Sequence, residues 1–514
     1  MDKIKNGPIS AYYKDKNIFI TGGTGFIGKA LIEKLLRSCP GVGNIYILLR
    51  SKKGMNLEER CQKLFSNPIF DNLKNSNSDV FYKVIPVRGN VAEANLGLSS
   101  SDRQILIEKV NVIFHAAASV RFDDFIKDAI LTNLRSARDM ALLSLEMKNI
   151  EVFVHVSTAY CSITENKTVP EKLLPARGNW KKAIYLAENG EENILNTFSH
   201  KFIGDFPNTY TYTKHLAEHC INDLLTSKIP TVIVRPTIVV AAINEPLRGW
   251  IDNWNGINGL CVGAGFGVFR IGLGDPNIGS DCTPVDNVVK VLILSAWNRA
   301  QRKSLGTVEI MQSSAYNQKK YSIKHFTKIA MDAGYEVPLD VKMWYPNITF
   351  TQCWTYYYIN AILIHFMPAV LLDLFLKLFG HKPFLFKIQR KVFVSNIALN
   401  YFMTHDWDFL NDNAMKLFND DMLGSEKEEF KFHMVKNDKE TYDYIKDSFR
   451  TTRWVLLNMS KEIKPRTMAL NKGLYYLDKL CKGLFYLAVI WFLFFKLNII
   501  TICWESTLKY WKKL

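Results

Sequence analysis

The 514-residue chain lacks the cysteine pattern of a disulfide-stapled protein. Its nine cysteines are scattered, with neither a Cys-x-x-Cys pair nor a framework of close spacings, and this pattern favours a reducing compartment. The polar segment 1–17 also lacks the apolar core of a signal peptide. We therefore expect that nothing at this end directs the chain into the secretory lumen.

A long basic arm and an RNA-binding signature are missing too, although the chain is basic. Lysine and arginine outnumber aspartate and glutamate by 65 to 49, which gives a formal net charge of +16. This balance favours an anionic partner, such as nucleic acid, a phosphate-bearing cofactor or an acidic lipid surface. Because no nucleic-acid motif accompanies the charge, we expect no nucleic-acid partner. The length predicts two or three domains.

The segment 17–38, NIFITGGTGFIGKALIEKLLRS, predicts a strand, a tight turn and a helix. A short apolar run precedes glycines 22, 25 and 28, and apolar residues at helical spacing follow. The first glycine permits the turn, the second lets the backbone approach a pyrophosphate, and the third lets the helix pack on the strand. Amides at the helix start then face the phosphates. The cofactor-binding candidates in this turn are Gly22, Thr24, Gly25, Phe26, Ile27 and Gly28.

The second predicted strand, NIYILLR, ends at Arg50 and is followed by Lys52 and Lys53. An NAD-binding unit usually carries an acidic residue here for the ribose 2′-hydroxyl. Cations in this place suit a 2′-phosphate instead, so we predict NADPH as the cofactor. An ordinary solvated basic turn is the alternative interpretation.

Later segments continue the alternation of strands and helices. VIPVRGNV and VNVIFHAAASVRF read as buried strands that run into small or polar residues. The alternation predicts an α/β fold with a doubly wound parallel sheet. The cofactor candidates at these strand ends are Asn90, Val91, Ala116, Ala117 and Ala118. The alanines either leave room for the cofactor or simply allow close packing.

Residues 208–220, NTYTYTKHLAEHC, are compatible with two unrelated chemistries. Tyr210 precedes Lys214 by four residues, so both lie on one helical face, where the ammonium can favour the phenolate. His215, Glu218 and His219 also spell His-x-x-Glu-His, a zinc-peptidase pattern. Zinc would need a third ligand that the sequence does not identify, and a glycine turn has no use in a peptidase. We therefore predict a redox Tyr/Lys pair and no metal.

A second hydroxyl is expected at the end of the strand in VFVHVSTAY, where Ser157 and Thr158 are adjacent. One-residue offsets at strand ends leave the choice open, and either hydroxyl can also serve as a turn or helix cap.

Together, the glycine turn, HAAASVRF, VHVSTAY and Tyr210/Lys214 resemble an extended short-chain dehydrogenase/reductase. More narrowly, TGGTGFIGKALIEKLLRSCPGV, RPTIVV, EPLRGWIDNWNG and VGAGFGVFR resemble the alcohol-forming fatty acyl-CoA reductases. The resemblance implies an NADPH-dependent reduction of long-chain acyl-CoA to a primary alcohol through an aldehyde. It favours Thr158 over Ser157 and places Pro236 and Thr237 beside the nicotinamide. The chain departs from the family at Asn90, where aspartate is frequent, and at Ser136, where glycine is usual.

The second half resembles the C-terminal male-sterility domain of these reductases, through VKMWYPNITF, IQRKVF and YFMTHDWDFLNDN. We therefore divide the chain into a Rossmann reductase domain (1–320), a mainly helical domain (321–460), a basic linker (461–483), a membrane segment (484–504) and a tail (505–514). Polar residues interrupt the apolar segment 354–379, which predicts helices that dip into lipid, pack on protein or line an acyl tunnel.

The apolar run from Leu484 to Cys503 is long enough, at about 30 Å of helix, to cross a bilayer despite Lys496. We predict membrane attachment with the catalytic half in the cytosol, on the endoplasmic reticulum, with peroxisome and lipid droplet as alternatives. The alternative functions are a hydroxysteroid- or sugar-nucleotide-type dehydrogenase, or a non-catalytic membrane scaffold.

Overall fold

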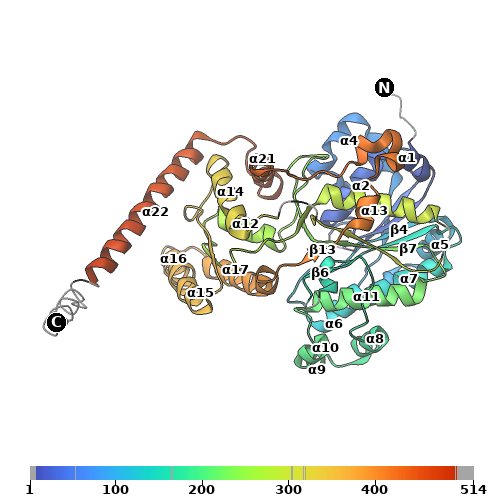
Figure 1. The fold of residues 1–514 in the computed structure, drawn as a ribbon, viewed down its shortest axis with the longest axis horizontal. Coiled ribbons are helices and arrows are strands. Elements are labelled where there is room, and N and C mark those ends of the chain that lie inside the picture. The colour runs from blue at the N-terminus through green and yellow to red at the C-terminus, as the bar shows by residue number, and fades with distance from the viewer. Residues whose placement is uncertain are drawn as a thin grey trace, which may run out of the picture.

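A sheet of seven parallel strands forms the centre of the computed structural model (Figure 1). The structure describes residues 7–492 and 494, apart from residues 52, 53, 164, 165, 303, 304, 317 and 319. The strand order is β11-β7-β5-β4-β1-β2-β3. The strands are β1 (Ile18–Thr21), β2 (Ile45–Leu49), β3 (Val84–Arg88), β4 (Val112–His115), β5 (Val152–Val156), β7 (Thr231–Pro236) and β11 (Glu309–Ser313).

Helices cover both faces of this sheet, because successive side chains of each strand point to opposite faces. Ile18 and Ile20 of β1 pack in one apolar cluster with α2 (Phe26–Ser38) and α13 (Val285–Gln301). Phe19 between them packs in a second cluster with α7 (Ser136–Glu146) and α11 (Thr209–Leu225). The predicted doubly wound parallel fold is confirmed.

The edge strand β11 lies within residues 300–321, a mostly polar stretch whose sequence is typical of a connector. Its polar side chains are buried because they bind another part of the chain. Gln312 donates through Nε2 to the carbonyls of Val169 (2.9 Å) and Leu410 (2.8 Å). Buried polar side chains thus hid the apolar pattern that usually identifies a strand.

Part of the C-terminal half returns to the α/β body. The short strand β13 (Asp408–Phe409) pairs with β6 (Thr168–Val169), and α18 (Asp412–Lys416) contacts β11. Four buried side chains belong to the cluster of α2 and α13: Ala414, Leu417, Leu423 and Phe430. Glu426 accepts the amides of Ile9 (2.8 Å) and Ser10 (3.1 Å) in α1 (Pro8–Tyr13). The core of the reductase half therefore includes residues beyond 400.

The other helices and strands complete the molecule. The α/β body also carries α3 (Leu57–Phe65), α4 (Asp71–Ser76), α5 (Ser100–Lys109), α6 (Ile126–Ala129), α8 (Trp180–Asn189), α9 (Glu192–Thr197), α10 (Ser199–Ile203), β8 (Ile238–Val240) and β10 (Cys282–Pro284). The short helices α19 (Asp420–Leu423) and α20 (Lys427–Phe430) also belong to the body, and beside it lie α12 (Ile257–Gly265), β9 (Ile271–Leu273), α14 (Ile323–Glu336), β12 (Thr349–Thr351), α17 (Leu385–Leu399) and α21 (Asp438–Thr451).

Residues Trp354–Leu378 form one apolar helical stretch of 25 residues with a mean hydropathy of 2.0, long enough to cross a membrane. It comprises α15 (Trp354–Asn360), a π-helical turn (Ala361–Phe366) and α16 (Met367–Leu378). Its buried residues recur every four positions, at Tyr357, Ala361, His365 and Ala369. His365 accepts the amide of Arg270 (3.0 Å), which fixes this face on the protein. Most of the other large apolar side chains are exposed.

The last described helix, α22 (Pro465–Trp491), extends away from the body (Figure 1). Most of the expected basic linker, 461–483, is therefore the first part of this helix. The first part of the expected membrane segment, 484–504, belongs to this helix. Beyond residue 492 only residue 494 is described, so the rest of that segment and the tail, 505–514, lie outside the described residues.

Candidate active site

The predicted cofactor residues follow the carboxyl ends of adjacent strands. Thr237 follows β7, Thr158 follows β5, the alanines follow β4, the glycine turn follows β1, Arg50 follows β2 and Asn90 follows β3. These strands are neighbours in the order β7-β5-β4-β1-β2-β3. Ligands of open α/β sheets bind at this edge, where the strand order reverses. The topology thus places these segments, which extend from Gly22 to Thr237 in the sequence, in one row of strand ends along the carboxyl edge of the sheet.

The turn after β1 has no room for a side chain at Gly22 and Gly28. Gly22 has φ +76°, and a Cβ there would lie 2.8 Å from the amide nitrogen of Ala117. A Cβ on Gly28 would collide with the carbonyl of Gly22, while Gly25 is the N-cap of α2. The amides of Thr24, Phe26 and Ile27 lie at the start of this helix, where an anion is favoured. Close packing and the helix start together suit a pyrophosphate.

Thr21 at the end of β1 holds the alanine segment against this turn. It accepts the amide of Ala116 through its carbonyl (3.2 Å) and that of Ala117 through Oγ1 (3.2 Å), and it lies 2.8 Å from Nδ1 of His115. Burial lowers the pKa of His115 to about 3, so its ring is neutral. Ala116, Ala117 and Ala118 are each partly exposed, which leaves their surface available to a ligand. Neither Thr21 nor His115 was singled out from the sequence.

Tyr210 and Thr158 interact, whereas Ser157 points elsewhere. Tyr210 is in the first turn of α11 and is partly exposed. Burial raises its pKa, Cys161 adds to the rise, and hydrogen bonding with the Thr158 side chain opposes it. The Ser157 hydroxyl lies 3.5 Å from Sγ of Cys161 and lowers the pKa of Glu218 by hydrogen bonding. Of the two adjacent hydroxyls, the one at Thr158 therefore faces the phenol.

Lys214 is buried one turn further along α11, and its ammonium donates to the carbonyl of Val156 (2.7 Å). Burial lowers its pKa to about 8. Burial has the largest effect on the pKa of Tyr210 and raises it. The expectation that the Lys214 ammonium favours the phenolate stays a prediction.

Asn133 connects the alanine segment with α11. Its Oδ1 accepts the amide of Ser119 (2.8 Å), and its Nδ2 donates to the carbonyl of Ser119 (3.1 Å) and to Oγ1 of Thr213 (3.1 Å). It lies in a π-helical turn, Ile130–Arg135, that precedes α7. Asn133 therefore joins the alanine segment to a helix whose backbone departs from regular α-helical geometry at this point.

The His-x-x-Glu-His residues are bound to protein partners. Glu218 and Arg235 form a fully buried bidentate ion pair, with N–O distances of 2.8 Å and 2.6 Å. His215 accepts the amide of Arg177 at Nε2 (3.1 Å), and its Nδ1 lies 3.1 Å from the carbonyl of Cys161. In this structure the His-x-x-Glu-His residues therefore contribute to packing, since Glu218 holds Arg235 inside the protein.

The segment after β7 lies next to a buried carboxyl group. Pro236 ends β7 opposite Ser313 of β11, as a residue without an amide donor often does. Oγ1 of Thr237 donates to Oδ1 of Asp281 (2.8 Å), which also accepts the amide of Ala315 (2.9 Å). Burial raises the pKa of Asp281. No motif or periodicity in the sequence indicated this aspartate.

Two arginines flank the segment after β2. Arg50 is exposed, and its carbonyl accepts a hydrogen bond from Arg60. Arg88 at the end of β3 donates to Oγ of Ser51 (3.0 Å). Lys52 and Lys53 lie outside the described residues. The side chain of Asn90 stabilises its own turn, through the amide of Ala92 (3.2 Å) and through Glu93 (3.0 Å), and Val91 packs in the second apolar cluster.

Aromatic residues from both halves of the chain surround Tyr210. Phe122 stacks on its ring with a centroid distance of 6.0 Å, and Phe402 packs on Phe122 at 5.3 Å. Tyr160 packs on Phe402 at 5.2 Å. Residue 402 belongs to the C-terminal half, so this half helps to form the wall of the site.

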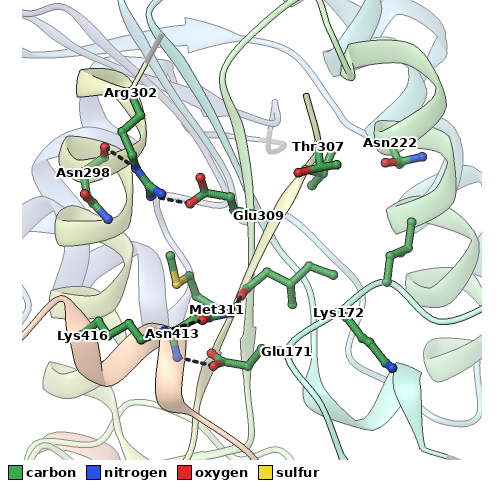
Figure 2. Close-up of a pocket in the computed structure, with 13 residues that line it drawn as sticks. Glu171, Lys172, Asn222, Asn298, Arg302, Thr307, Glu309, Met311, Asn413 and Lys416 are labelled. Carbon is green, nitrogen blue, oxygen red and sulfur yellow. Dashed lines mark hydrogen bonds and ion pairs between the residues drawn. The ribbon is translucent and has the colours of Figure 1, made fainter. Parts of the chain in front are cut away.

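A separate cavity of about 560 Å³ lies at the sheet edge formed by β11 (Figure 2). Its lining includes none of the predicted site residues. Glu171 there accepts the amides of Gln312 (2.6 Å) and Asn413, and burial raises its pKa to about 7. Figure 2 shows Glu171 directed at Asn413, so this carboxyl group fastens the returning segment to β11.

Comparisons with solved structures agree with the fold. The terminal reductase domain of the myxalamid PKS-NRPS pathway gives a TM-score of 0.58 at 17% identity, over 85% of this chain and 90% of that domain. A reductase domain of a nonribosomal peptide synthetase from Mycobacterium tuberculosis gives 0.57 at 16% identity, over 87% and 92%. At these identities the likeness shows the fold alone.

Comparisons with known sequences show the family. Two family models described as male sterility protein match residues 20–292 and 364–459. Fatty acyl-CoA reductase 1 of Rattus norvegicus is 38% identical over 80% of this chain and 79% of its own length. Fatty acyl-CoA reductase 1 of Homo sapiens is 35% identical, again over 80% and 79%. Fatty acyl-CoA reductase wat of Drosophila melanogaster is 36% identical over 80% and 78%. The chain therefore belongs to the fatty acyl-CoA reductases of the extended short-chain dehydrogenase/reductase family.

Proposed function

We propose that this protein reduces long-chain fatty acyl-CoA to a primary alcohol, with NADPH as the donor and an aldehyde as the intermediate. One observation carries the proposal within this family. Thr158 lies in the row of strand ends that also contains the glycine turn, and its side chain hydrogen-bonds with Tyr210 of α11. A phenol and a hydroxyl in that position can stabilise an oxyanion and protonate it.

The residues fit a dinucleotide cofactor, because the turn at Gly22 and Gly28 excludes any Cβ and leads into the amides of α2. Bound NADPH would supply hydride at the substrate carbonyl. Thr158 would donate a hydrogen bond to the oxygen as it becomes negative, and Tyr210 would give it a proton. In the first round the C–S bond would break, its electron pair and the proton would leave with the sulfur of CoA, and an aldehyde would remain. In the second round hydride from a second NADPH would reach the aldehyde carbon, and the oxygen would keep the proton from Tyr210 to give the alcohol.

The raised pKa of Tyr210 suits a proton donor. A phenol with an ordinary pKa of about 10 is already neutral at pH 7, and burial keeps it so until charge develops on the substrate. Lys214, which is bound at the end of β5, would contact the nicotinamide ribose. Burial raises the pKa of Cys161 to about 12, so this thiol stays protonated and does not serve as an acyl acceptor.

We propose NADPH rather than NADH because of the cations around the segment after β2. Arg50 is exposed there, Arg60 binds its carbonyl, and Arg88 is bound to the next residue, Ser51. Guanidinium groups bind phosphate well, and none of the three is paired with a carboxylate among the described residues. An Arg50→Ala variant should lose preference for NADPH over NADH, measured as the ratio of the two kcat/KM values.

We also propose membrane attachment with the catalytic half in the cytosol, where acyl-CoA and NADPH are available. The buried stripe from Tyr357 to Ala369 holds α15 and the start of α16 on the protein, which supports a position in the membrane interface rather than across the bilayer. The segment 484–504 would then supply the spanning anchor. Endoplasmic reticulum is the proposed location, with peroxisome or lipid droplet as alternatives.

The test is product analysis with purified enzyme in detergent, incubated with palmitoyl-CoA and either NADPH or NADH. We expect hexadecanol and free CoA, with NADPH preferred. Oxidation of a hydroxysteroid or sugar nucleotide without any alcohol from palmitoyl-CoA would contradict the proposal. Full alcohol output from a Tyr210→Phe variant in cells would instead indicate a scaffold without catalysis of its own.

A further inference from the structure

A cavity of about 310 Å³ lies among α12, α14 and α21, outside the row of strand ends. Figure 1 shows these three helices beside the α/β body, above the helices α15 to α17 in this view. Each helix turns one face to the cavity, at spacings of three or four residues: Cys261 and Ala264 on α12, Ala330 and Gly334 on α14, and Ile445 and Phe449 on α21. The stretch 249–274 supplies one wall, through residues such as Ile251, Leu260 and Phe269.

The lining is mostly apolar but also includes Asp281, Lys320 and Lys342, and the cavity volume falls in the range of small-molecule sites. Burial raises the pKa of Cys261 to about 11, as expected for a thiol among apolar neighbours. A site of this kind offers few hydrogen-bond partners to a ligand. It gains affinity chiefly by removing apolar surface from water, which suits an alkyl chain.

One polar group of the lining lies beside the predicted nicotinamide position. Asp281 is 3% exposed, and its Oδ2 has no hydrogen-bond partner among the described residues. Its Oδ1 accepts from Thr237, which follows β7 in the row of cofactor-binding strand ends. The carboxyl group of Asp281 thus marks the end of the cavity that adjoins the cofactor site.

The same end lies close to the proposed proton donor. Met403 lines the cavity, while the preceding residue, Phe402, packs on Phe122, whose ring stacks on Tyr210. Likewise, Val240 of β8 lines the cavity, and Ile238 of the same strand packs against the cluster that contains Tyr160 and Phe402. Two separate segments therefore connect the cavity wall with the surroundings of the phenol.

The far side of the cavity leads toward the exposed apolar helices. Phe350 of β12 belongs to the lining, and α15 begins four residues later at Trp354. An acyl chain held by a lipid surface at α15 and α16 would have an apolar route inward.

We propose that this cavity binds the alkyl chain of the substrate, with its thioester end near Asp281 and Met403 and its methyl end among α12, α14 and α21. This inference rests on the proposed function and adds the residues that would measure chain length. Because the cavity has a limited volume, side chains that enlarge into it should shorten the longest acyl chain accepted.

The experiment compares Ala330→Phe and Cys261→Phe, which fill the cavity from two different helices, with Lys328→Phe, which places the same side chain on the exposed face of α14. Alcohol formation is measured for acyl-CoA chains from octanoyl to stearoyl. Both filling variants should lose about tenfold or more in kcat/KM for palmitoyl-CoA and stay within about twofold for octanoyl-CoA. The control should keep the wild-type profile. An equal effect at every chain length in both folded filling variants would overturn the inference.

A binding measurement separates this inference from the proposed function. The fluorescence of cis-parinaric acid is titrated with full-length wild-type protein and with each variant, without cofactor, after thermal unfolding has shown that the variants are folded. Saturable binding to wild type and to Lys328→Phe, but weak binding to both filling variants, supports the cavity as the alkyl site. Equal binding to all four proteins overturns it. Absence of alcohol from wild type at every chain length would overturn the proposed function, whatever the binding result.

Discussion

The helices α2 and α16 contain similar apolar residues and differ in what surrounds them. In α2, Leu31, Ile32 and Leu35 are fully buried between the sheet and α13. In α16, Leu371, Leu374, Phe375 and Leu378 are between 54% and 83% exposed. An apolar surface of this extent is unusual on a protein that faces only water. The α/β body thus buries its apolar groups in itself, whereas α15 and α16 present theirs outward.

The difference shows how the two regions share the work of a lipid-metabolising enzyme. The body encloses polar groups that must be held in place, such as Glu218 with Arg235, and the strand ends that carry the site. The helices offer an interface at which a lipid substrate can be collected. The predictions below test each side of this division.

The largest effect is expected for the proton donor in the body. Tyr210→Phe should lower kcat for palmitoyl-CoA by about 10²- to 10⁴-fold, because the oxyanion loses its proton source. NADPH affinity, measured by fluorescence titration, should stay near wild type. Tyr212→Phe is the matched control on the same helix, since Tyr212 packs in the apolar cluster of α7 and α11. Comparable losses in the two variants would exclude a specific role for Tyr210.

The buried ion pair should dominate the stability of the body. Glu218→Gln leaves the guanidinium of Arg235 buried without its carboxylate, so the free energy of unfolding should fall by about 3–5 kcal/mol. The exposed pair of Glu336 and Lys446 gives a contrast, and Glu336→Gln should cost about 1 kcal/mol or less. Urea denaturation in detergent, followed by tryptophan fluorescence, measures both. A small effect at Glu218 would show that Arg235 finds another partner.

The apolar helices should control affinity for lipid. Leu374→Glu combined with Leu378→Glu should weaken binding of the full-length chain to liposomes by about tenfold or more, since burial of each leucine contributes about 1.5–3 kcal/mol. The control is Ile105→Glu with Leu142→Glu, two residues of the body with exposures of 40% and 42%. An equal loss of affinity in both double variants would contradict a lipid-binding role that is specific to α15 and α16. Liposome flotation gives the readout.

The smallest effect concerns pH. Burial lowers the pKa of Lys214 to about 8, so its ammonium loses its proton as pH rises through that value. Affinity for NADPH should therefore be highest below pH 8 and fall as pH increases, by at most about tenfold per pH unit. Lys214→Met should bind NADPH weakly, without this dependence. An unchanged wild-type affinity from about pH 7 to about pH 9 would mean that the neutral amine serves as well.

The local parts of the site could be predicted from the sequence because each depends on neighbouring residues. Gly22, Gly25 and Gly28 define one turn, and Tyr210 and Lys214 lie one helical turn apart. The parallel sheet followed from the alternation of strands and helices. The NADPH preference and the catalytic roles stay predictions until they are measured.

The parts that were missed depend on contacts between residues far apart in the chain. Gln312 in β11 looked like part of a polar connector because its partner, Leu410, comes much later. Asp281 became a candidate only because it accepts a hydrogen bond from Thr237 and lines the cavity. Phe402 lies near Tyr210 because both pack on Phe122. No periodicity in a short window reports such pairings.

The return of residues 408–434 to the α/β core also determines when this protein can fold during synthesis. Phe430 belongs to the same cluster as Ile18, and Glu426 holds the amides of α1. A nascent chain that has left the ribosome only as far as β11 still lacks these groups, and part of its apolar core is open to solvent. The catalytic body therefore closes only when α15 and α16 have already emerged. Until translation has passed residue 434, the nascent chain exposes the open core of the body as well as the apolar helices α15 and α16.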